Sequence, residues 1–598
     1  MKIDRRRFVT GALGGGAVAA LAPWFPAWAQ SVSPGIVAPL PTVSGNDISL
    51  RIARQTMRVD GKLSRAIGIN GTVPAPLVRL KEGQTARLTV INDLDEDSSI
   101  HWHGLILPFH MDGVPGVSFP GIKPRSSFVY EFPVVQSGTY WYHSHSGLQE
   151  QLGHYGPIVI DPAGADPVGY DREHVVVLSD HSPLSPEAIF RKLKVNPGHF
   201  NMQRQTLSGL LAGKDQSLKE RVEWGAMRMD PTDIADVNGS TYSFLVNGHG
   251  PRDNWTALFH PGERVRLRIV NASAMTIFNV RIPGLRMTVV QADGLNVVPT
   301  AIDEFQIAVA ETYDVIVTPV EDRAYTLVAE ANDRSGMGRA TLAPRAGMAA
   351  EVPPLRERPL ATMKDMGMGA MAAGGGDAAC APEHAAMGHC TPAPAEDHSA
   401  HGAAGGAAGA AAMQHSMRDF SVAPQVKRDP SVQTISPMPT DRMGEPGQGL
   451  ENAGHKVLTY HDLVALERNP DVRAASRSLD IHLTGNMERF MWSFDGVKMS
   501  DHHEPIPFIE GERVRINLIN DSMMSHPIHL HGHFFELVTG KGDRSPRKHT
   551  VLVQPGGTAS FDFTADALGD WAFHCHMLYH MHAGMMRVVS VRPKGDAA

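Results

Sequence analysis

The sequence predicts an all-β protein built from three β-sandwich domains in series, and three observations support this. One strand pattern occurs three times: GQTARLTVIN from Gly83, GERVRLRIVN from Gly262 and GERVRINLIN from Gly511. Polar and apolar residues alternate through each copy, which is the period of a half-buried strand. Turns rich in Gly, Pro, Asn and Asp recur between such strands, whereas long helical periodicity is rare. The expected domain limits are 45–165, 170–345 and 450–598.

The second copy shows the alternation most clearly. Arg264, Arg266 and Arg268 fall on one face of the predicted strand, and the apolar residues between them fall on the other. We therefore expect this strand to be half buried, with its arginine face uncovered. The segments 128–132 and 174–178 have similar strand character.

Composition narrows the class of protein. The 598 residues include 55 Lys and Arg against 63 Asp and Glu, for a formal net charge of −8, which argues against a nucleic-acid partner. Hydrophobic residues make up 42% and charged residues 20%, so the chain can bury a core. Three cysteines cannot supply a disulfide framework for a chain of this length. The 30 His and 28 Met residues point to metal binding by borderline and soft ligands.

Residues 1–29 have the features of an export signal. Arg5, Arg6 and Arg7 precede a short Gly/Ala-rich apolar run, and Ala27-Trp28-Ala29 forms a small-x-small cleavage site. Paired arginines of this kind resemble a twin-arginine signal, so we expect a periplasmic protein. A membrane anchor is the alternative, but glycine and proline interrupt the run. No other stretch approaches about 20 uninterrupted apolar residues, so no stable membrane span is expected.

Residues 346–430 differ in composition from the rest of the chain. They are rich in Ala, Gly, Pro, Met and His, which predicts a flexible insert without a core of its own. Thioether, imidazole and thiol groups together suit Cu(I), although a linker of drifted composition is the alternative. Cys380 and Cys390 could also pair as a disulfide. The candidate ligands are Met363, Met366, Met368, Met371, Met387, Met413, Met417, His384, His389, His398, His401, His415, Cys380 and Cys390.

Four histidine motifs carry the chemistry, two in the first predicted domain and two in the third. A single HxH pair is weak, because such pairs are often surface or core residues and also suit zinc. Four of them on one chain are hard to explain by chance. The motifs are HWHG from His101, HSH from His143, HPIHLHG from His526 and HCH from His574, the last followed by His580 and Met585.

The HCH motif can join two metal sites. In an extended strand, residues i and i+2 project to one face and i+1 to the other, so Cys575 points away from His574 and His576. One metal can bind the thiolate while a second group binds the two imidazoles. This covalent path suits electron transfer between a mononuclear site and a cluster.

Ligand chemistry indicates copper at both sites. One thiolate, two imidazoles and one thioether, from Cys575, His526, His580 and Met585, form the blue-copper ligand set. Zinc would prefer a tetrahedral site without a thioether. Eight further imidazoles suit a three-copper cluster with room for oxygen: His101, His103, His143, His145, His529, His531, His574 and His576.

On these motifs the sequence resembles the multicopper oxidases, and more closely the bacterial periplasmic copper-resistance oxidases of the CopA type. The resemblance covers most of the chain, including SIHWHG at 99–104, TYWYHSHSGLQEQ at 139–151, NMERFMWSFDG at 486–496 and WAFHCHMLYHMHAGMM at 571–586. It implies three cupredoxin domains, with the cluster between the first and the last, and four coppers per chain. The implied type 1 ligands are His526, Cys575, His580 and Met585. The implied type 2 ligands are His101 and His529, and His103, His143, His145, His531, His574 and His576 would hold the type 3 pair.

The implied reaction is four one-electron oxidations coupled to the reduction of O₂ to two waters. Asp112 resembles an acid that delivers protons near the cluster in this family, although Asp-Gly is also a common turn pair. Some cuprous oxidases also have an acid between the type 1 His and Met; residues 581–584 contain no carboxylate, so the second proton route stays open.

Cu(I) is the favoured substrate, because methionines gather near the expected point of electron entry. They are Met577, Met581, Met586, Met523 and Met524, in addition to those of 346–430. Each alone is more simply a core residue. Two alternatives stay open: a laccase-like oxidase of phenols or amines, and a periplasmic copper-sequestering protein without turnover. Oligomeric state stays open as well.

Overall fold

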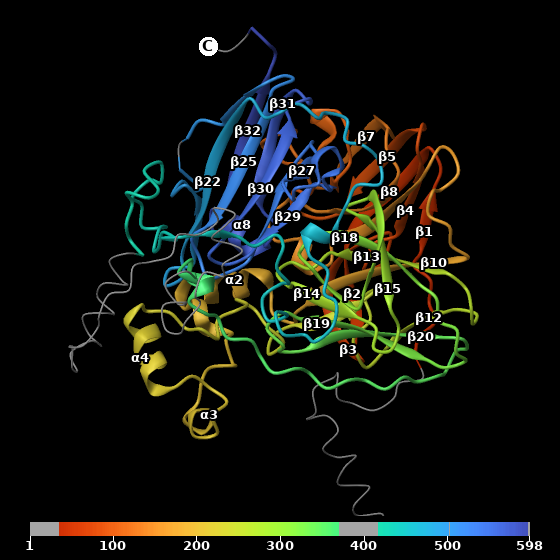
Figure 1. Cartoon of the computed structure of the whole chain (residues 1–598). Coiled ribbons are helices and arrows are strands. Elements are labelled where there is room, and N and C mark those ends of the chain that lie inside the picture. The colour runs from red at the N-terminus through yellow and green to blue at the C-terminus, as the bar shows by residue number, and fades with distance from the viewer. Residues whose placement is uncertain (1–34, 370–416, 502, 596–598) are drawn as a thin grey trace, which may run out of the picture.

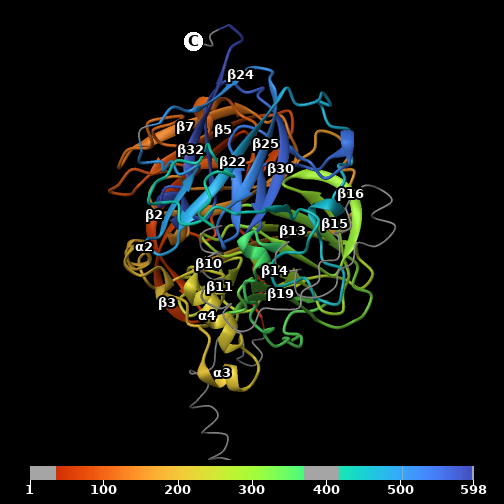
Figure 2. The ribbon, with the colours of Figure 1, turned by 60° about the vertical axis from the view of Figure 1, so that its left-hand side comes forward.

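The structure is a computed structural model that describes residues 35–369, 417–501 and 503–595. Its described part consists mainly of strands, arranged in six sheets. Figure 1 shows the first domain in red and orange beside the third in blue, with the second in yellow and green against both; Figure 2 agrees. The expected export signal at 1–29 lies outside the described residues.

The first domain pairs a five-stranded sheet with a four-stranded one. The sheet that carries two histidine motifs has the order β1 (Thr42–Ser44), β4 (Leu77–Lys81), β9 (Tyr155–Asp161), β8 (Gly138–His143), β6 (His101–His103). The other has the order β3 (Lys62–Ile69), β2 (Asp47–Val59), β5 (Thr85–Asn92), β7 (Ser127–Pro133). β5 is the first repeat copy, and its alternating residues Ala86, Leu88 and Val90 are buried as the pattern predicts. The whole of β1 lies just before the expected limit of 45.

The second domain pairs sheets of six and five strands. The six-stranded sheet has the order β11 (Ser243–Val246), β10 (Arg172–His181), β13 (Val265–Asn271), β18 (Thr312–Val317), β15 (Met287–Ala292), β16 (Leu295–Ile302). The five-stranded sheet has the order β12 (Trp255–Leu258), β20 (Met337–Ala343), β19 (Tyr325–Ala331), β14 (Phe278–Arg281), β17 (Glu304–Ile307). The second repeat copy forms β13 in this domain, and the third copy forms a strand of the third domain. Each sandwich therefore contains one copy of the pattern.

The third domain carries the other two histidine motifs. One of its sheets has the order β23 (Met491–Phe494), β22 (Arg477–Asn486), β25 (Arg513–Asn520), β30 (Gly557–Thr564), β27 (Phe535–Leu537), β28 (Arg547–Lys548). The other has the order β24 (Ile506–Ile509), β32 (Met586–Arg592), β31 (Gly569–Cys575), β26 (His526–Leu530), β29 (Thr550–Val553). A short strand ahead of the expected limit of 450, β21 (Thr440–Asp441), pairs with β30.

The second repeat copy is not half buried, and that expectation was wrong. Every residue of β13 is buried, including Arg266 and Arg268. Arg268 donates to Thr139 of the first domain and to Asp314, and Arg266 also pairs with Asp314. Arg268 of this face thus meets the first domain, and Asp314 of its own domain compensates the buried charge, whereas Arg264, just before β13, stays exposed.

A helical excursion leaves the second domain between β10 and β11. It contains α2 (Pro186–Val195), α3 (Leu207–Leu211) and α4 (Leu218–Ala226). Ser185 and Ser217 cap the first and last of these helices through their side chains. The rarity of long helical periodicity gave no warning of this segment, because its helices are only 5 to 10 residues long.

The segment 346–430 is packed at both ends, which corrects the expectation for its flanks. Ala361, Met366 and Met368 on one side and Met417 on the other are buried in a common cluster. Thioethers and neighbouring aromatic and aliphatic groups supply the apolar area that the composition seemed to lack. Residues 370–416, with the remaining expected ligands and both cysteines, lie outside the described part. Within the described ranges, no helix has the length and apolarity to cross a membrane.

Candidate metal centres

The first centre is a buried sulfur site in the third domain. His526 begins β26, Cys575 ends β31, and His580 lies on the short helix α8 (Leu578–His582) that follows. Cys575 Sγ is 3.6 Å from His526 Nδ1 and 3.8 Å from His580 Nδ1, and the two imidazole nitrogens are 3.2 Å apart. Met585 is fully buried after α8, and its carbonyl oxygen accepts a hydrogen bond from the backbone N–H of Cys575.

Groups from other segments fix the two imidazoles of this centre. Ser522 Oγ lies 2.8 Å from His526 Nε2, and Asp236 Oδ2 lies 2.7 Å from His580 Nε2. Metal-bound histidines are commonly oriented in this way through their second nitrogen. The indole of Trp492 covers His580 with ring centroids 4.0 Å apart. Burial raises the pKa of Asp236 to about 7 and lowers the pKa of His580 to about 3, so the imidazole is neutral and can act as a ligand.

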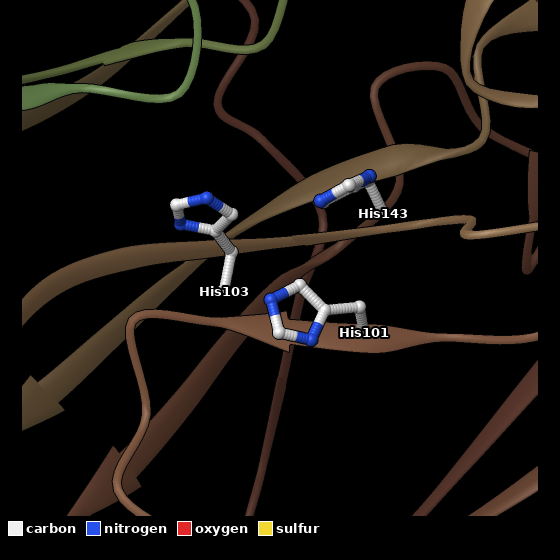
Figure 3. Close-up of side chains that lie close together, drawn as sticks. All are labelled: His101, His103 and His143. Carbon is white, nitrogen blue, oxygen red and sulfur yellow. The ribbon is translucent and has the colours of Figure 1, made fainter. Parts of the chain in front are cut away.

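The second centre is a cluster of eight histidines between the first and third domains. His101, His103 and His143 surround one space with their rings, from the edge strand β6 and its neighbour β8 (Figure 3). His574 Nε2 is 3.0 Å from His531 Nε2 within the third domain and, across the domain boundary, 3.4 Å from His145 Nε2. Three groups of the cluster have all their ligand atoms within 4.8 Å of one another: His101, His103 and His143; His101, His529 and His531; His145, His531 and His574.

The two centres lie on opposite sides of one strand end. Cys575 faces His526 and His580, while the flanking His574 faces His145 and His531. His576 packs near His103 and His143, with ring centroids 4.9 Å from each. The pleat of β31 therefore separates thiolate and imidazoles as the HCH spacing predicts.

The donor atoms of the cluster suit a metal. Several buried imidazole nitrogens have no hydrogen-bond partner, which costs free energy unless a metal binds them: His101 Nε2, His103 Nδ1 and Nε2, His143 Nε2, His529 Nε2, and His576 Nδ1 and Nε2. Burial lowers the pKa of His574 to about 4 and lowers those of His103, His143 and His576 well below 6.5. The rings are therefore neutral at pH 7, as ligation requires.

Two buried acids orient the cluster. Asp112 Oδ2 lies 2.9 Å from His531 Nδ1, and its Oδ1 lies 3.3 Å from His101 Nδ1. Glu150 Oε2 lies 2.8 Å from His143 Nδ1. Asp112 was singled out from the sequence. Glu150, Asp236 and Ser522 were missed, and only Glu150 carried a signal, because it stands inside the TYWYHSHSGLQEQ motif.

The family's models match all three sandwiches. The description "Multicopper oxidase" applies to matches at residues 51–165, 214–347 and 473–595. This chain belongs to the multicopper oxidase family. A "Copper resistance protein A homolog" of Pseudomonas syringae pv. tomato is 47% identical, and "Copper resistance protein A" of Escherichia coli is 46% identical; in each case 99% of both chains is covered.

The fold agrees with solved structures of the same family. The structure described as "Multicopper oxidase from Campylobacter jejuni: a metallo-oxidase" superposes with a TM-score of 0.58, at 17% identity, over 94% of this chain and 95% of that one. The predicted all-β architecture of three cupredoxin-like domains is thereby confirmed. The chain is therefore a multicopper oxidase, an enzyme of a family that uses copper, O₂ and a reducing substrate.

Beside the sulfur site, this multicopper oxidase has a second sulfur-rich region, here called the methionine cluster. It joins the helical excursion to both flanks of 346–430, to the loop before β26 and, through Met487, to the end of β22. Its methionines are Met227, Met229, Met363, Met366, Met368, Met417, Met487 and Met523. Met523 stands three residues before His526, and Ile234, also in the cluster, stands two residues before Asp236. The cluster therefore adjoins both imidazoles of the sulfur site through short stretches of chain.

Proposed function

We propose that this oxidase converts Cu(I) to Cu(II) in the periplasm and couples four such oxidations to the reduction of O₂ to two waters. The methionine cluster beside the sulfur site is the observation that carries the choice of substrate. Thioethers favour Cu(I) over harder ions, and eight of them converge here. The periplasmic location rests on the export signal expected at 1–29.

The proposed copper ligands follow the family's pattern at positions where the geometry is suitable. Copper held at these positions would accept single electrons at the sulfur site and deliver them to O₂ at the cluster. Type 1 copper is assigned to His526, Cys575, His580 and Met585, type 2 copper to His101 and His529, and the type 3 pair to His103, His143, His145, His531, His574 and His576.

The chain's own residues then have distinct tasks. Asp236 forms a hydrogen bond with His580 and stands two residues after Ile234 of the methionine cluster. It therefore links the methionine cluster, where Cu(I) is proposed to bind, to the sulfur site. Cys575 is joined covalently to His574 and His576, which gives electrons a short path to the cluster. Asp112, buried against His101 and His531, can hold a proton beside the place where O₂ is reduced.

A cavity supports access of O₂ to the cluster. It has a volume of about 1420 Å³ and is lined by strands of the first domain, by residues 182–187 and by His145. His145 belongs to the proposed type 3 set and is only partly buried. Oxygen and water could therefore exchange at this side without passing the sulfur site.

The methionine cluster gives a direct test of substrate. Replacing Met366, Met368 and Met417 together by leucine keeps the apolar volume and removes the thioethers. We expect kcat/KM for Cu(I) to fall by tenfold or more, chiefly through KM, while oxidation of a phenol is unchanged. Met287→Leu is the matched control, since Met287 is equally buried but lies in β15 of the second domain.

Other results of these assays would favour the laccase-like or the copper-sequestering alternative. An equal loss for Cu(I) and phenol would contradict a role of the thioethers in substrate choice. A parent enzyme that prefers phenols would be laccase-like. Copper uptake without oxygen consumption at an oxygen electrode would instead indicate sequestration.

A further inference from the structure

A carboxylate of the second domain reaches the histidine cluster, although that domain supplies none of the proposed copper ligands. Asp293 and Gly294 form the two-residue turn between β15 and β16. Their φ angles are 47° and 79°, and a hairpin turn with positive φ at both positions suits the pair Asp-Gly. Asp293 is fully buried. The turn therefore carries a charged side chain into the interior of the molecule.

The turn is held from two sides. A Cβ at Gly294 would lie 2.2 Å from the ring of Tyr140 in β8, and one at Gly138 would lie 2.0 Å from the Gly294 carbonyl oxygen. The turn thus packs directly on the sheet that carries the first two histidine motifs. Within its own domain, the N–H of Asp293 donates to the Thr312 carbonyl oxygen at 2.8 Å.

The carboxylate reaches a proposed copper ligand through one peptide group. Asp293 Oδ2 accepts hydrogen bonds from the backbone N–H groups of His549 and Thr550, both at 3.2 Å. The carbonyl oxygen of His549 accepts a hydrogen bond from His529 Nδ1 at 2.6 Å. The Thr550 N–H and the His549 carbonyl belong to the same amide. The carboxylate on one side of this amide therefore polarises the carbonyl that holds the imidazole on the other side.

The surroundings of Asp293 require an ionised carboxylate. Oδ2 faces the two backbone N–H groups, whereas Oδ1 faces the Thr312 N–H at 3.1 Å and Lys548 Nζ at 3.0 Å. Burial raises the pKa of this carboxyl group, but Lys548 and the surrounding N–H donors outweigh burial, so the pKa is lowered. An amide in this place would turn its NH₂ group toward donors on one side or the other.

His529 thus has an indirect counterpart of the carboxylates that other cluster histidines meet directly. His531 Nδ1 lies 2.9 Å from Asp112, and His143 Nδ1 lies 2.8 Å from Glu150. Such partners orient a ligating imidazole and increase the basicity of its other nitrogen. At His529 that other nitrogen, Nε2, is buried and has no hydrogen-bond partner among the described residues.

We propose that Asp293 is a positioning residue for the type 2 copper: through the peptide group between His549 and Thr550 it orients His529 and strengthens the bond from His529 Nε2 to the metal. The second domain then sets the affinity of a copper site whose ligands all come from the other two domains. The inference rests on the proposed copper ligands.

The test removes the carboxylate and keeps the turn. Asp293→Asn creates Asn-Gly, which suits the same turn. In the copper-loaded full-length protein, chelators should remove type 2 copper about 10- to 100-fold more readily than from the parent. Electron spin echo measurements at type 2 copper should show a changed quadrupole coupling at the remote nitrogen of one imidazole, because that coupling depends on the hydrogen bond at Nδ1. The visible thiolate band of the sulfur site should persist.

Asp60→Asn is the matched control. Asp60 and Gly61 form the same kind of turn between β2 and β3, with φ angles of 47° and 83°. Asp60 Oδ1 likewise accepts hydrogen bonds from two successive backbone N–H groups across a domain boundary, those of Arg252 at 2.8 Å and Asp253 at 3.2 Å. Both donors lie in the second domain, which holds none of the proposed ligands. The control should therefore keep the parent's type 2 copper and its spectrum, whatever stability it loses.

The results separate positioning from a merely structural role. Type 2 copper held as tightly in Asp293→Asn as in the parent, with the same quadrupole coupling, would overturn the inference, and so would an equal change in Asp60→Asn. Asp293→Gly, which fits the positive φ without strain, should repeat the loss and serves if the asparagine variant does not fold. A parent that takes up no type 2 copper would contradict the proposed copper ligands themselves, and the inference with them.

Discussion

Replacing Asp112 by asparagine tests how the cluster's imidazoles are oriented. The carboxylate of Asp112 faces two ring nitrogens, His531 Nδ1 at 2.9 Å and His101 Nδ1 at 3.3 Å. The backbone carbonyl oxygen of residue 112 also lies 2.7 Å from His101 Nδ1, and the variant retains it. An amide has one acceptor oxygen, so in either orientation it turns its NH₂ group toward one imidazole N–H.

The size of the effect follows from that geometry. One hydrogen bond to a charged group contributes about 1.5–3 kcal/mol. If this loss falls on the oxygen-reducing step, the conversion of 1.36 kcal/mol per tenfold gives a decrease in turnover of about 10- to 150-fold. Loss of a carboxylate that supports a metal-bound histidine typically costs 10- to 100-fold, which is the same range.

The assay is oxygen uptake with Cu(I), together with copper content and the visible spectrum. We expect slow oxygen reduction in Asp112→Asn and an unchanged thiolate band, because Asp112 contacts the cluster and not the sulfur site. Asp521→Asn is the control: Asp521 is equally buried and lies 2.8 Å from His482 Nδ1, but belongs to neither centre. Turnover in Asp112→Asn at the parent's rate would refute the reasoning.

Two further predictions concern electron transfer and acid stability. Cys575→Ser should abolish the intense visible band and oxygen uptake, since the thiolate is both ligand and electron path; a blue, fully active variant would contradict this. Glu173 is partly buried, which raises its pKa, but Arg268 of its own domain and Arg79 of the first domain outweigh this burial and lower the pKa to about 2. A lowered folded-state pKa stabilises the protein above about pH 4.5, by about 3 kcal/mol at most, and this contribution is lost as the pH falls from about 4.5 to 2. Denaturant unfolding between pH 2 and 7 should therefore show a weaker pH dependence in Glu173→Gln than in the parent, and parallel curves would exclude this ion pair as the cause.

Much of the site could be predicted because the motifs act locally. The two-residue period of a strand places Cys575 opposite His574 and His576 whatever the rest of the chain does. The ligand chemistry of thiolate, imidazole and thioether then points to copper. The same local rule failed for β13, where alternation predicted an open arginine face, because Arg268 packs against Thr139 of the first domain and Arg266 pairs with Asp314 on the neighbouring strand β18.

The sequence by itself determined the class of fold, the metal and the motif residues, because backbone sterics and ligand preference operate over a few neighbouring residues. Tertiary structure alone decided which distant groups meet them: Asp236 at His580, Asp112 at His531, and the methionine cluster drawn from five segments. These contacts join residues that are tens to hundreds of positions apart. They depend on how whole sandwiches pack against one another, and no local pattern records that packing.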